Sequence, residues 1–149
     1  MVKNRSAVSA VAYLHPNARA LRPEGNAVKH ALIIEDNALI AVMIRDYLEE
    51  CGYDSVLAST QGEAIQLAEQ RCPDLITVDD RLEPGSGIEA IRHICHDREI
   101  PVIFIVADPT NVQRTLPNAL LFQKPFSERA LAIAIRAAEK VPLVFAEPG

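Results

Sequence analysis

The segment PDLITVDDRLEPGSG, residues 73–87, combines a short, largely apolar run with two adjacent aspartates and a glycine-containing turn. A strand that is covered on both faces of a parallel sheet has such a nearly continuous apolar sequence. Asp79 and Asp80 therefore stand where a buried strand, LITV at 75–78, ends. One aspartate could simply cap the strand. A nucleophilic aspartate would require a metal site and a positive charge from other parts of the chain.

Further short apolar runs alternate with helical patterns on both sides of this segment. The expected strands are ALII, SVLA, LITV, PVIFIVA and ALLF, at residues 31–34, 55–58, 75–78, 101–107 and 119–122. Helical spacing of apolar residues covers 37–51, 61–71, 86–96 and 127–140, and between the last two strands Pro109 and Pro117 leave room for only a short helix. This alternation predicts an α/β protein with a doubly wound parallel sheet of five strands and a shortened fourth helix.

The composition agrees with a sheet sandwiched between helices. The chain has 149 residues, of which 49% are apolar and only 5% aromatic, and it contains no tryptophan. This length allows one domain with its own aliphatic core. We expect that domain to span residues 29–149 and residues 1–28 to form a flexible N-terminal extension.

Charge and cysteine content narrow the class of function. Residues 1–28 carry four basic side chains against Glu24, a charge of +3, so the remainder must carry −8 to give the net charge of −5. An acidic body argues against direct nucleic-acid binding, and no apolar run approaches the roughly 20 residues of a membrane span. Three scattered cysteines predict reduced thiols in a cytoplasmic protein. His93, Cys95 and His96 form an alternative, less favoured metal site.

Ionisable side chains follow several of the predicted strands directly. They are Glu35, Asp36, Asp79, Asp80, Asp108 and Lys124. Because ligands of parallel sheets bind beyond the carboxyl ends of the strands, we expect these side chains to converge at one edge. Clustered carboxylates need a cation, and their hard oxygen atoms suit Mg²⁺. With a lysine opposite, the group fits phosphoryl transfer to an aspartate. Taken singly, Glu35 and Asp36 could also be helix caps and Lys124 a solvated surface residue.

Together these motifs resemble the receiver domain of two-component response regulators over residues 29–140. The matching pieces, in the family's order, are LIIEDN, PDLITVD, GSGIE and KPF. The resemblance implies a flavodoxin-like sheet with strand order 2-1-3-4-5. It also implies that Asp79, which ends the third strand, is the phosphoacceptor. Strand alternation turns Asp80 to the opposite side, although Asp80 stays open as an alternative acceptor.

The resemblance also implies a cofactor and partners. Mg²⁺ would be bound by Asp36 and Asp79, by Glu35 through a water, and by the backbone carbonyl of Arg81. Lys124 would pair with a phosphoryl oxygen and would precede a cis proline. The donor would be a histidine kinase or a histidine phosphotransfer protein, with only slow self-catalysed phosphotransfer and dephosphorylation as enzymatic activity. Since nine residues follow the last predicted helix, we expect a stand-alone regulator. It would act on a downstream or competing regulator protein, and homodimer formation is left open.

Two positions depart from the family pattern. Val106 stands where the family has Ser or Thr, and Leu121 where it often has Tyr or Phe. The missing hydroxyl omits one hydrogen bond to a phosphoryl oxygen, worth roughly 1.5–3 kcal/mol. These differences leave a second hypothesis, a pseudo-receiver that binds partners without control by phosphorylation. A third hypothesis, a Mg²⁺-dependent phosphatase, is disfavoured because the sequence VDDRL lacks a D-x-D motif and there is no room for a cap domain.

Overall fold

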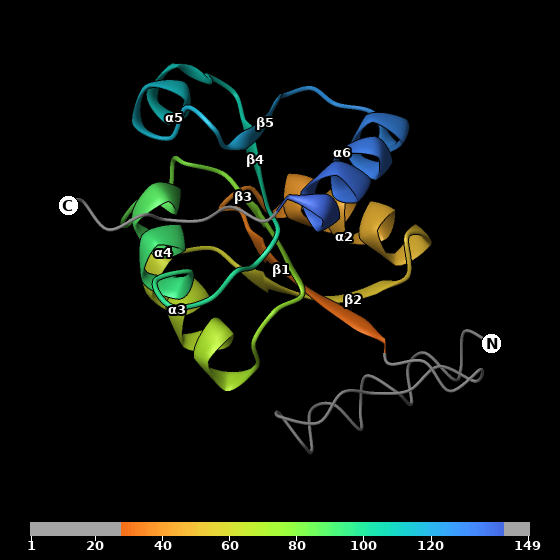
Figure 1. Ribbon diagram of the computed structural model, residues 1–149, viewed down its shortest axis with the longest axis horizontal. Coiled ribbons are helices and arrows are strands. Elements are labelled where there is room, and N and C mark those ends of the chain that lie inside the picture. The colour runs from red at the N-terminus through yellow and green to blue at the C-terminus, as the bar shows by residue number, and fades with distance from the viewer. Residues whose placement is uncertain (1–27, 142–149) are drawn as a thin grey trace.

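The computed structural model of the protein describes residues 28–141, which form a five-stranded parallel sheet with helices on both faces (Figure 1). The strand order β2-β1-β3-β4-β5 confirms the fold class and topology expected from the sequence. The strands are β1 (Lys29–Ile34), β2 (Tyr53–Ala58), β3 (Leu75–Val78), β4 (Val102–Val106) and β5 (Leu120–Gln123). The helices are α2 (Ala38–Glu50), α3 (Gln61–Gln70), α4 (Gly87–Ile94), α5 (Thr110–Thr115) and α6 (Glu128–Lys140). The expected N-terminal extension lies outside the described residues, except for Val28.

Two apolar layers hold the helices against the sheet. Helices α3, α4 and α5 cover one face, and α2 and α6 cover the other (Figure 1). Successive residues of each strand alternate between the layers, so that Ile76 and Val78 face the first and Leu75 faces the second. Apart from Tyr53 and Phe104, the largest fully buried side chains are leucine and isoleucine. The core is therefore the aliphatic one that the composition predicts.

The register of the central strands brings distant residues to the same edge. Ile34 at the end of β1 lies opposite Val78 at the end of β3. The backbone N–H of Asp79 donates a 2.9 Å hydrogen bond to the carbonyl oxygen of Ile34. Glu35 and Asp79 consequently leave the sheet side by side, although 44 positions of sequence separate them.

Polar side chains determine where most of the helices begin. A side-chain oxygen at the N-cap accepts a hydrogen bond from a backbone N–H of the first turn in α2, α3, α4 and α6. The capping residues are Asn37, Thr60, Ser86 and Ser127. Helix α5 has only six residues, and Pro109 at its N-cap makes no side-chain hydrogen bond. This confirms the predicted shortening of the fourth helix of the fold.

The limits of β3 are those predicted, and the limits of the other strands differ from the predicted ones by one or two residues. Strand β2 begins at Tyr53 rather than at Ser55, because Tyr53 pairs with Lys29 of β1. The Tyr53 hydroxyl also donates to Glu139 Oε2 at 2.5 Å, and Lys29 Nζ lies 2.8 Å from the same oxygen. These contacts attach the last turn of α6 to the start of the sheet. Strand β5 is shifted by one residue and ends at Gln123.

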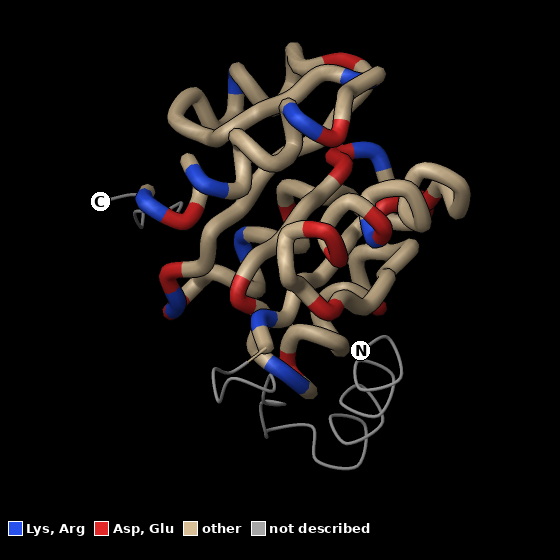
Figure 2. The backbone as a smooth tube through the Cα atoms, turned by 90° about the vertical axis from the view of Figure 1, so that its right-hand side faces the viewer, with Lys and Arg blue, Asp and Glu red and all other residues tan. Residues whose placement is uncertain are grey.

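Charged residues of both signs are interspersed along the described chain. Figure 2 shows Lys and Arg positions separated by Asp and Glu positions rather than gathered along one helix of residues 28–141. Phosphate-backbone binding uses a basic stripe or patch, and this distribution does not resemble one. No helix within the described range is both long and apolar enough to span a membrane. Cys51, Cys72 and Cys95 form no disulfide; Cys51 and Cys72 are exposed, and Cys95 is buried.

Candidate functional site

Three of the predicted site residues meet at the carboxyl edge of the sheet. Lys124 Nζ lies 2.7 Å from Glu35 Oε1 and 2.8 Å from Asp79 Oδ2. The backbone N–H of Lys124 also donates to the carbonyl oxygen of Val106 at 2.7 Å, so the residue after β5 is held against the end of β4. The peptide bond between Lys124 and Pro125 is cis, as the resemblance implied. Parallel pairing thus places one ammonium group between two carboxylates.

Asp36 completes a cluster of three carboxylates with Glu35 and Asp79. One oxygen from each side chain lies within 4.8 Å of the others. Glu35 and Asp79 are buried, whereas Asp36 is exposed and opens the cluster to solvent. An all-oxygen donor set with a solvent-facing side fits Mg²⁺, which uses few carboxylates and retains several waters. Among residues 28–141, no other group of three or more His, Cys, Asp or Glu donors lies so close together.

Burial and hydrogen bonds act in opposite directions on the carboxyl group of Glu35. Desolvation raises its pKa above the ordinary 4.5, and the hydrogen bonds from Lys124 and from the backbone N–H of Asn37 oppose the increase only in part. The negative charge of Asp79 adds to the increase in pKa. Burial lowers the pKa of Lys124, but its hydrogen bonds to Asp79 and Glu35 outweigh burial, so that its pKa is raised above 10.5. The lysine therefore remains a cation at neutral pH.

The two adjacent aspartates contact different partners. Asp79 Oδ2 accepts from the ammonium group of Lys124 at 2.8 Å. Asp80 Oδ2 accepts from Asn111 Nδ2 in α5 at 2.8 Å, and its Oδ1 accepts from the backbone N–H of Ile88 in α4 at 3.4 Å. Both residues follow β3, which ends at Val78, and their side chains contact different elements. Of the two aspartates, Asp79 is the one whose side chain contacts Lys124.

The loop between β3 and α4 packs closely on Asp79. The backbone N–H of Arg81 donates to Asp79 Oδ1 at 3.2 Å, while the Arg81 side chain is exposed to solvent. Arg81 thus contacts Asp79 through its backbone N–H and not through its side chain. Gly85 in the same loop has a φ of +101°, a conformation that favours glycine. Gly87 lies so close to the Asp79 carbonyl oxygen that a Cβ atom at this position would collide with it.

Apolar side chains occupy the two positions that depart from the family pattern. Val106 is buried at the end of β4 and packs in the same layer as Val112 of α5 and Leu121 of β5. Phe122 belongs to the opposite layer and stacks on Phe126, with ring centroids 6.3 Å apart. The end of β4 therefore presents methyl groups where the family presents a hydroxyl.

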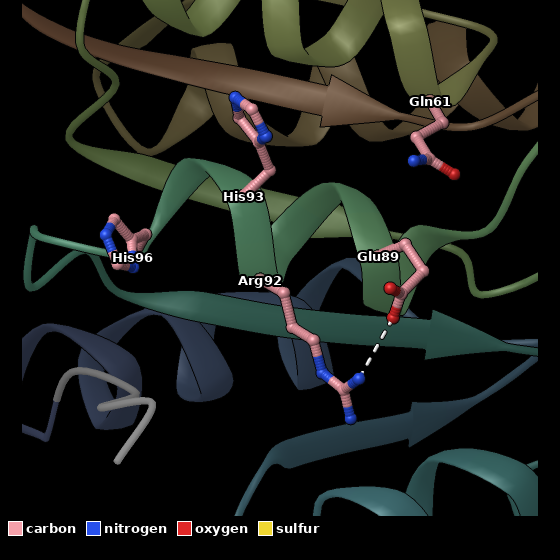
Figure 3. A pocket seen from close by; sticks show the side chains of 5 residues that line it. All are labelled: Gln61, Glu89, Arg92, His93 and His96. Atoms are coloured by element: carbon pink, nitrogen blue, oxygen red, sulfur yellow. Dashed lines mark hydrogen bonds and ion pairs between the residues drawn. The ribbon is translucent and has the colours of Figure 1, made fainter. Parts of the chain in front are cut away.

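A groove of about 430 Å³ lies between α3 and α4 (Figure 3), lined by Gln61, Glu89, Arg92, His93 and His96. In Figure 3 the imidazole rings of His93 and His96 point in different directions. The thiol of Cys95 is buried instead of facing the groove. These three residues form no cluster of metal-type donors within the described part of the chain. The structure therefore does not bring His93, Cys95 and His96 together as the less favoured metal site would require.

Comparison with known proteins identifies the family. Residues 31–136 match the family model described as the response regulator receiver domain. The chain therefore belongs to the receiver domains of two-component signalling, as the motif resemblance implied.

Individual relatives agree with this assignment. The polar-differentiation response regulator DivK of Brucella ovis is 38% identical over 82 residues, which cover 53% of this chain and 67% of DivK. The receiver domain of the response regulator PhyR from Erythrobacter litoralis is 30% identical, with a TM-score of 0.70, covering 80% of this chain and 96% of that domain. The anti-anti-sigma factor PhyR from Bartonella quintana is 34% identical, with a TM-score of 0.66, covering 76% of this chain and 48% of that protein.

Several residues that shape the site are not among those predicted from the sequence. Asn37, whose side chain accepts from the N–H groups of the first turn of α2, is the helix cap, so the alternative that Glu35 and Asp36 cap this helix is wrong. The position of Asn37 directly before a helical pattern was the available signal. Gln61 Oε1 accepts from the Ser86 backbone N–H at 2.9 Å. This contact and that of Asn111 with Asp80 join residues 25 and 31 positions apart and have no local sequence signal.

Proposed function

We propose that the protein accepts a phosphoryl group on Asp79 from the phosphohistidine of a histidine kinase or a histidine phosphotransfer protein. A carboxylate oxygen of Asp79 forms the new O–P bond while the N–P bond to the donor imidazole breaks. Water later hydrolyses the acyl phosphate and regenerates the carboxylate. The observation that carries this proposal is the ammonium group of Lys124, which is bonded at once to Asp79 and Glu35 beside the cluster of three carboxylates.

The residues around Asp79 have distinct roles in this proposal. Glu35, Asp36 and Asp79 would hold Mg²⁺, and the backbone carbonyl of Arg81 would complete the protein ligands. When bound, Mg²⁺ supplies positive charge to the oxygens of the phosphoryl group being transferred. Lys124 neutralises the buried carboxylates before the reaction and then pairs with a phosphoryl oxygen. Because Asp36 is exposed, the donor reaches the cluster from its side.

The output proposed for this receiver is contact with another protein, either a downstream regulator or one that competes for the same donor. Membership in the receiver family supports this assignment. Two relatives, named a polar-differentiation response regulator and an anti-anti-sigma factor, are also regulatory proteins by their names. Histidine kinases draw their phosphoryl group from ATP, so the proposal implies a cytoplasmic site of action.

Incubation with Mg²⁺ and acetyl phosphate, followed by intact-mass measurement, tests the proposal. We expect a covalent phosphoryl adduct on the wild-type protein and none on Asp79→Asn. Asp80→Asn is the matched control, because it changes the neighbouring aspartate in the same way but leaves the contacts of Lys124 intact. Beryllofluoride, which mimics the acyl phosphate, provides a second readout through amide chemical shifts.

The other hypotheses predict different results in the same experiment. A binding module that ignores phosphorylation would give neither an adduct nor beryllofluoride-dependent shifts in the wild-type protein. A phosphatase would release phosphate from an external ester catalytically, and Asp79→Asn would stop the turnover. An adduct that persists in Asp79→Asn and disappears in Asp80→Asn would reassign the acceptor to Asp80.

A further inference from the structure

Asp80 contacts two helices next to the proposed acceptor. Its Oδ2 accepts from Asn111 Nδ2 in α5 at 2.8 Å, and its Oδ1 accepts from the backbone N–H of Ile88 in α4 at 3.4 Å. Its carbonyl oxygen accepts from the N–H of Gly87 at 2.8 Å. Asp80 shares a peptide bond with Asp79, so a rotation of that peptide shifts contacts to both helices.

Helix α5 depends on contacts of this kind for its position. It has six residues, and only Val112 among them is buried. Pro109 at its N-cap makes no side-chain hydrogen bond, and α5 lies at the edge of the molecule in Figure 1. A helix of this length is not stable by itself in water. Its position therefore depends on tertiary contacts, among them the packing of Val112 below it and the exposed hydrogen bond of Asn111 to Asp80 at its side.

A second contact connects the loop after β3 with the start of α5. Arg81 Nη2 lies 3.9 Å from Asp108 Oδ2, and Asp108 Oδ1 accepts from the N–H and the hydroxyl of Thr110 at 3.0 and 2.7 Å. The exposed ion pair is weak by itself. It nevertheless shows that two consecutive residues after Asp79, Asp80 and Arg81, both face the start of α5. The backbone N–H of Arg81 in turn donates to Asp79 Oδ1.

The side chain at the end of β4 offers no comparable connection. Val106 has no hydrogen-bonding side chain, and it is buried among apolar residues that include Val112 and Leu121. A phosphoryl group on Asp79 therefore cannot draw this side chain toward itself through a hydrogen bond. The polar contacts between the acceptor region and α5 run instead through the loop after β3.

We propose that Asp80 and Asn111 couple the chemical state of Asp79 to the position of α5, a role that rests on the proposed phosphoryl transfer to Asp79. A phosphoryl group on Asp79 alters the oxygen that accepts from the N–H of Arg81. The backbone from Asp79 to Arg81 adjusts, the carboxylate of Asp80 moves with it, and Asn111 carries the movement to α5. Asp80 and Asn111 are thus positioning residues that do not contact the phosphoryl group.

Amide chemical shifts recorded with and without Mg²⁺ and beryllofluoride test this coupling in the full chain. In the wild-type protein we expect shifts in residues 79–82 and also in residues 110–115. In Asn111→Ala we expect the shifts in residues 79–82 to remain. Those in residues 110–115 should become much smaller than in the wild-type protein, because the variant lacks the hydrogen bond that joins Asp80 to α5.

Two further variants separate coupling from a structural effect on α5. Gln113→Ala replaces another exposed amide side chain of the same helix, and it should leave the response of residues 110–115 unchanged. Asp80→Ala removes the other half of the hydrogen bond, so it should reproduce the effect of Asn111→Ala. The double variant should then add no further loss, because both single changes break the same contact.

Other results would overturn the coupling, and they show whether the proposed phosphoryl-acceptor function fails with it. A wild-type protein that shows shifts at residues 79–82 but none at residues 110–115 would overturn the coupling and leave the phosphoryl-acceptor function intact. An unchanged α5 response in Asn111→Ala would do the same. A wild-type protein that shows no response to beryllofluoride anywhere would overturn the proposed function and the coupling together.

Discussion

Lys124 is the residue that makes a buried pair of carboxylates tolerable in the absence of a metal ion. Its ammonium group contacts Glu35 and Asp79, and the Glu35 side chain is only 2% exposed. Removing one partner of a buried ionic contact leaves an uncompensated charge in a poorly solvated place. Without Lys124, the uncompensated negative charge would be that of the Glu35 and Asp79 carboxylates.

We expect Lys124→Met to lower the free energy of unfolding by about 3 kcal/mol without divalent cations. Mg²⁺ should stabilise this variant more than it stabilises the wild-type protein, since the lysine no longer competes for the same oxygens. Denaturant titrations with and without MgCl₂ measure both effects. Lys140→Met, which removes an exposed lysine from the last turn of α6, is the control and should stay within about 0.5 kcal/mol of wild type. Equal Mg²⁺ effects in the two proteins would contradict the competition.

Val106 packs in an apolar layer at a position where the family has a hydroxyl group. A hydroxyl introduced at this buried position meets apolar neighbours, so Val106→Thr should destabilise the unliganded protein by about 1–3 kcal/mol. The same hydroxyl could donate to a phosphoryl oxygen, and we expect the affinity for beryllofluoride to rise by about tenfold. Thermal unfolding and beryllofluoride titration measure the two opposing effects. Val106→Ala is the control that loses packing without gaining a donor, and it should show no gain in affinity.

At the scale of elements, the start of α4 is fixed by a close backbone approach. A Cβ atom at position 87 would collide with the carbonyl oxygen of Asp79 and would crowd the side chain of Val78. Because the obstacle is backbone, it cannot rotate aside as a side chain can. The loop that carries Asp80 and Arg81 past the site therefore requires glycine where α4 begins.

We expect Gly87→Ala to lower stability by about 1–3 kcal/mol and to weaken beryllofluoride binding, because relief of the collision displaces Asp79. Gly62→Ala is the matched control in α3, where nothing lies within 4 Å of the added Cβ. That change should be neutral or stabilise the protein by about 0.5–1 kcal/mol. Chemical denaturation of both variants gives the comparison. Two variants of equal stability would show that the loop adapts to a side chain at position 87.

The elements themselves are largely predictable from local sequence. Ser127 stands at the start of a helical pattern and predicts where α6 begins. Pro109 and Pro117 limit the segment between them and predict a short α5. The predicted limits fail where a tertiary contact extends an element. The start of β2 at Tyr53 is an example, since the hydroxyl of Tyr53 reaches Glu139, a residue 86 positions away. Local propensity carries no information about such a partner.

At the scale of the whole molecule, pH should control how strongly Mg²⁺ stabilises the fold. The pKa of Glu35 is raised in the folded state, chiefly by desolvation, so the folded protein binds this proton more tightly than the unfolded chain does. Ionised Glu35 therefore costs stability above its raised pKa, and that cost is relieved as the pH falls through the raised pKa toward 4.5. Mg²⁺ binding needs the ionised carboxylate and has the opposite dependence on pH.

We expect stabilisation by Mg²⁺ to be largest at neutral pH and to shrink as the pH falls toward 4.5. At a free Mg²⁺ concentration of about 100 times Kd, the neutral-pH gain should be about 2.7 kcal/mol. Melting temperatures measured with MgCl₂ and with EDTA across this pH range provide the test. Asp36→Asn should reduce the gain at every pH, because it removes a ligand without removing Glu35. A gain that does not change with pH would exclude Glu35 from the metal site.

The sequence by itself determined the α/β class, the five strands, the family and the residues that follow each strand. It could do so because period, capping and the position of charged residues after apolar runs are local features of a chain. Only the tertiary structure decided that Asp79 rather than Asp80 contacts Lys124, and that Asp80 contacts Asn111. These outcomes depend on strand register and on which side chains face each other across loops. Contacts between residues distant in the chain exist only after the chain has folded.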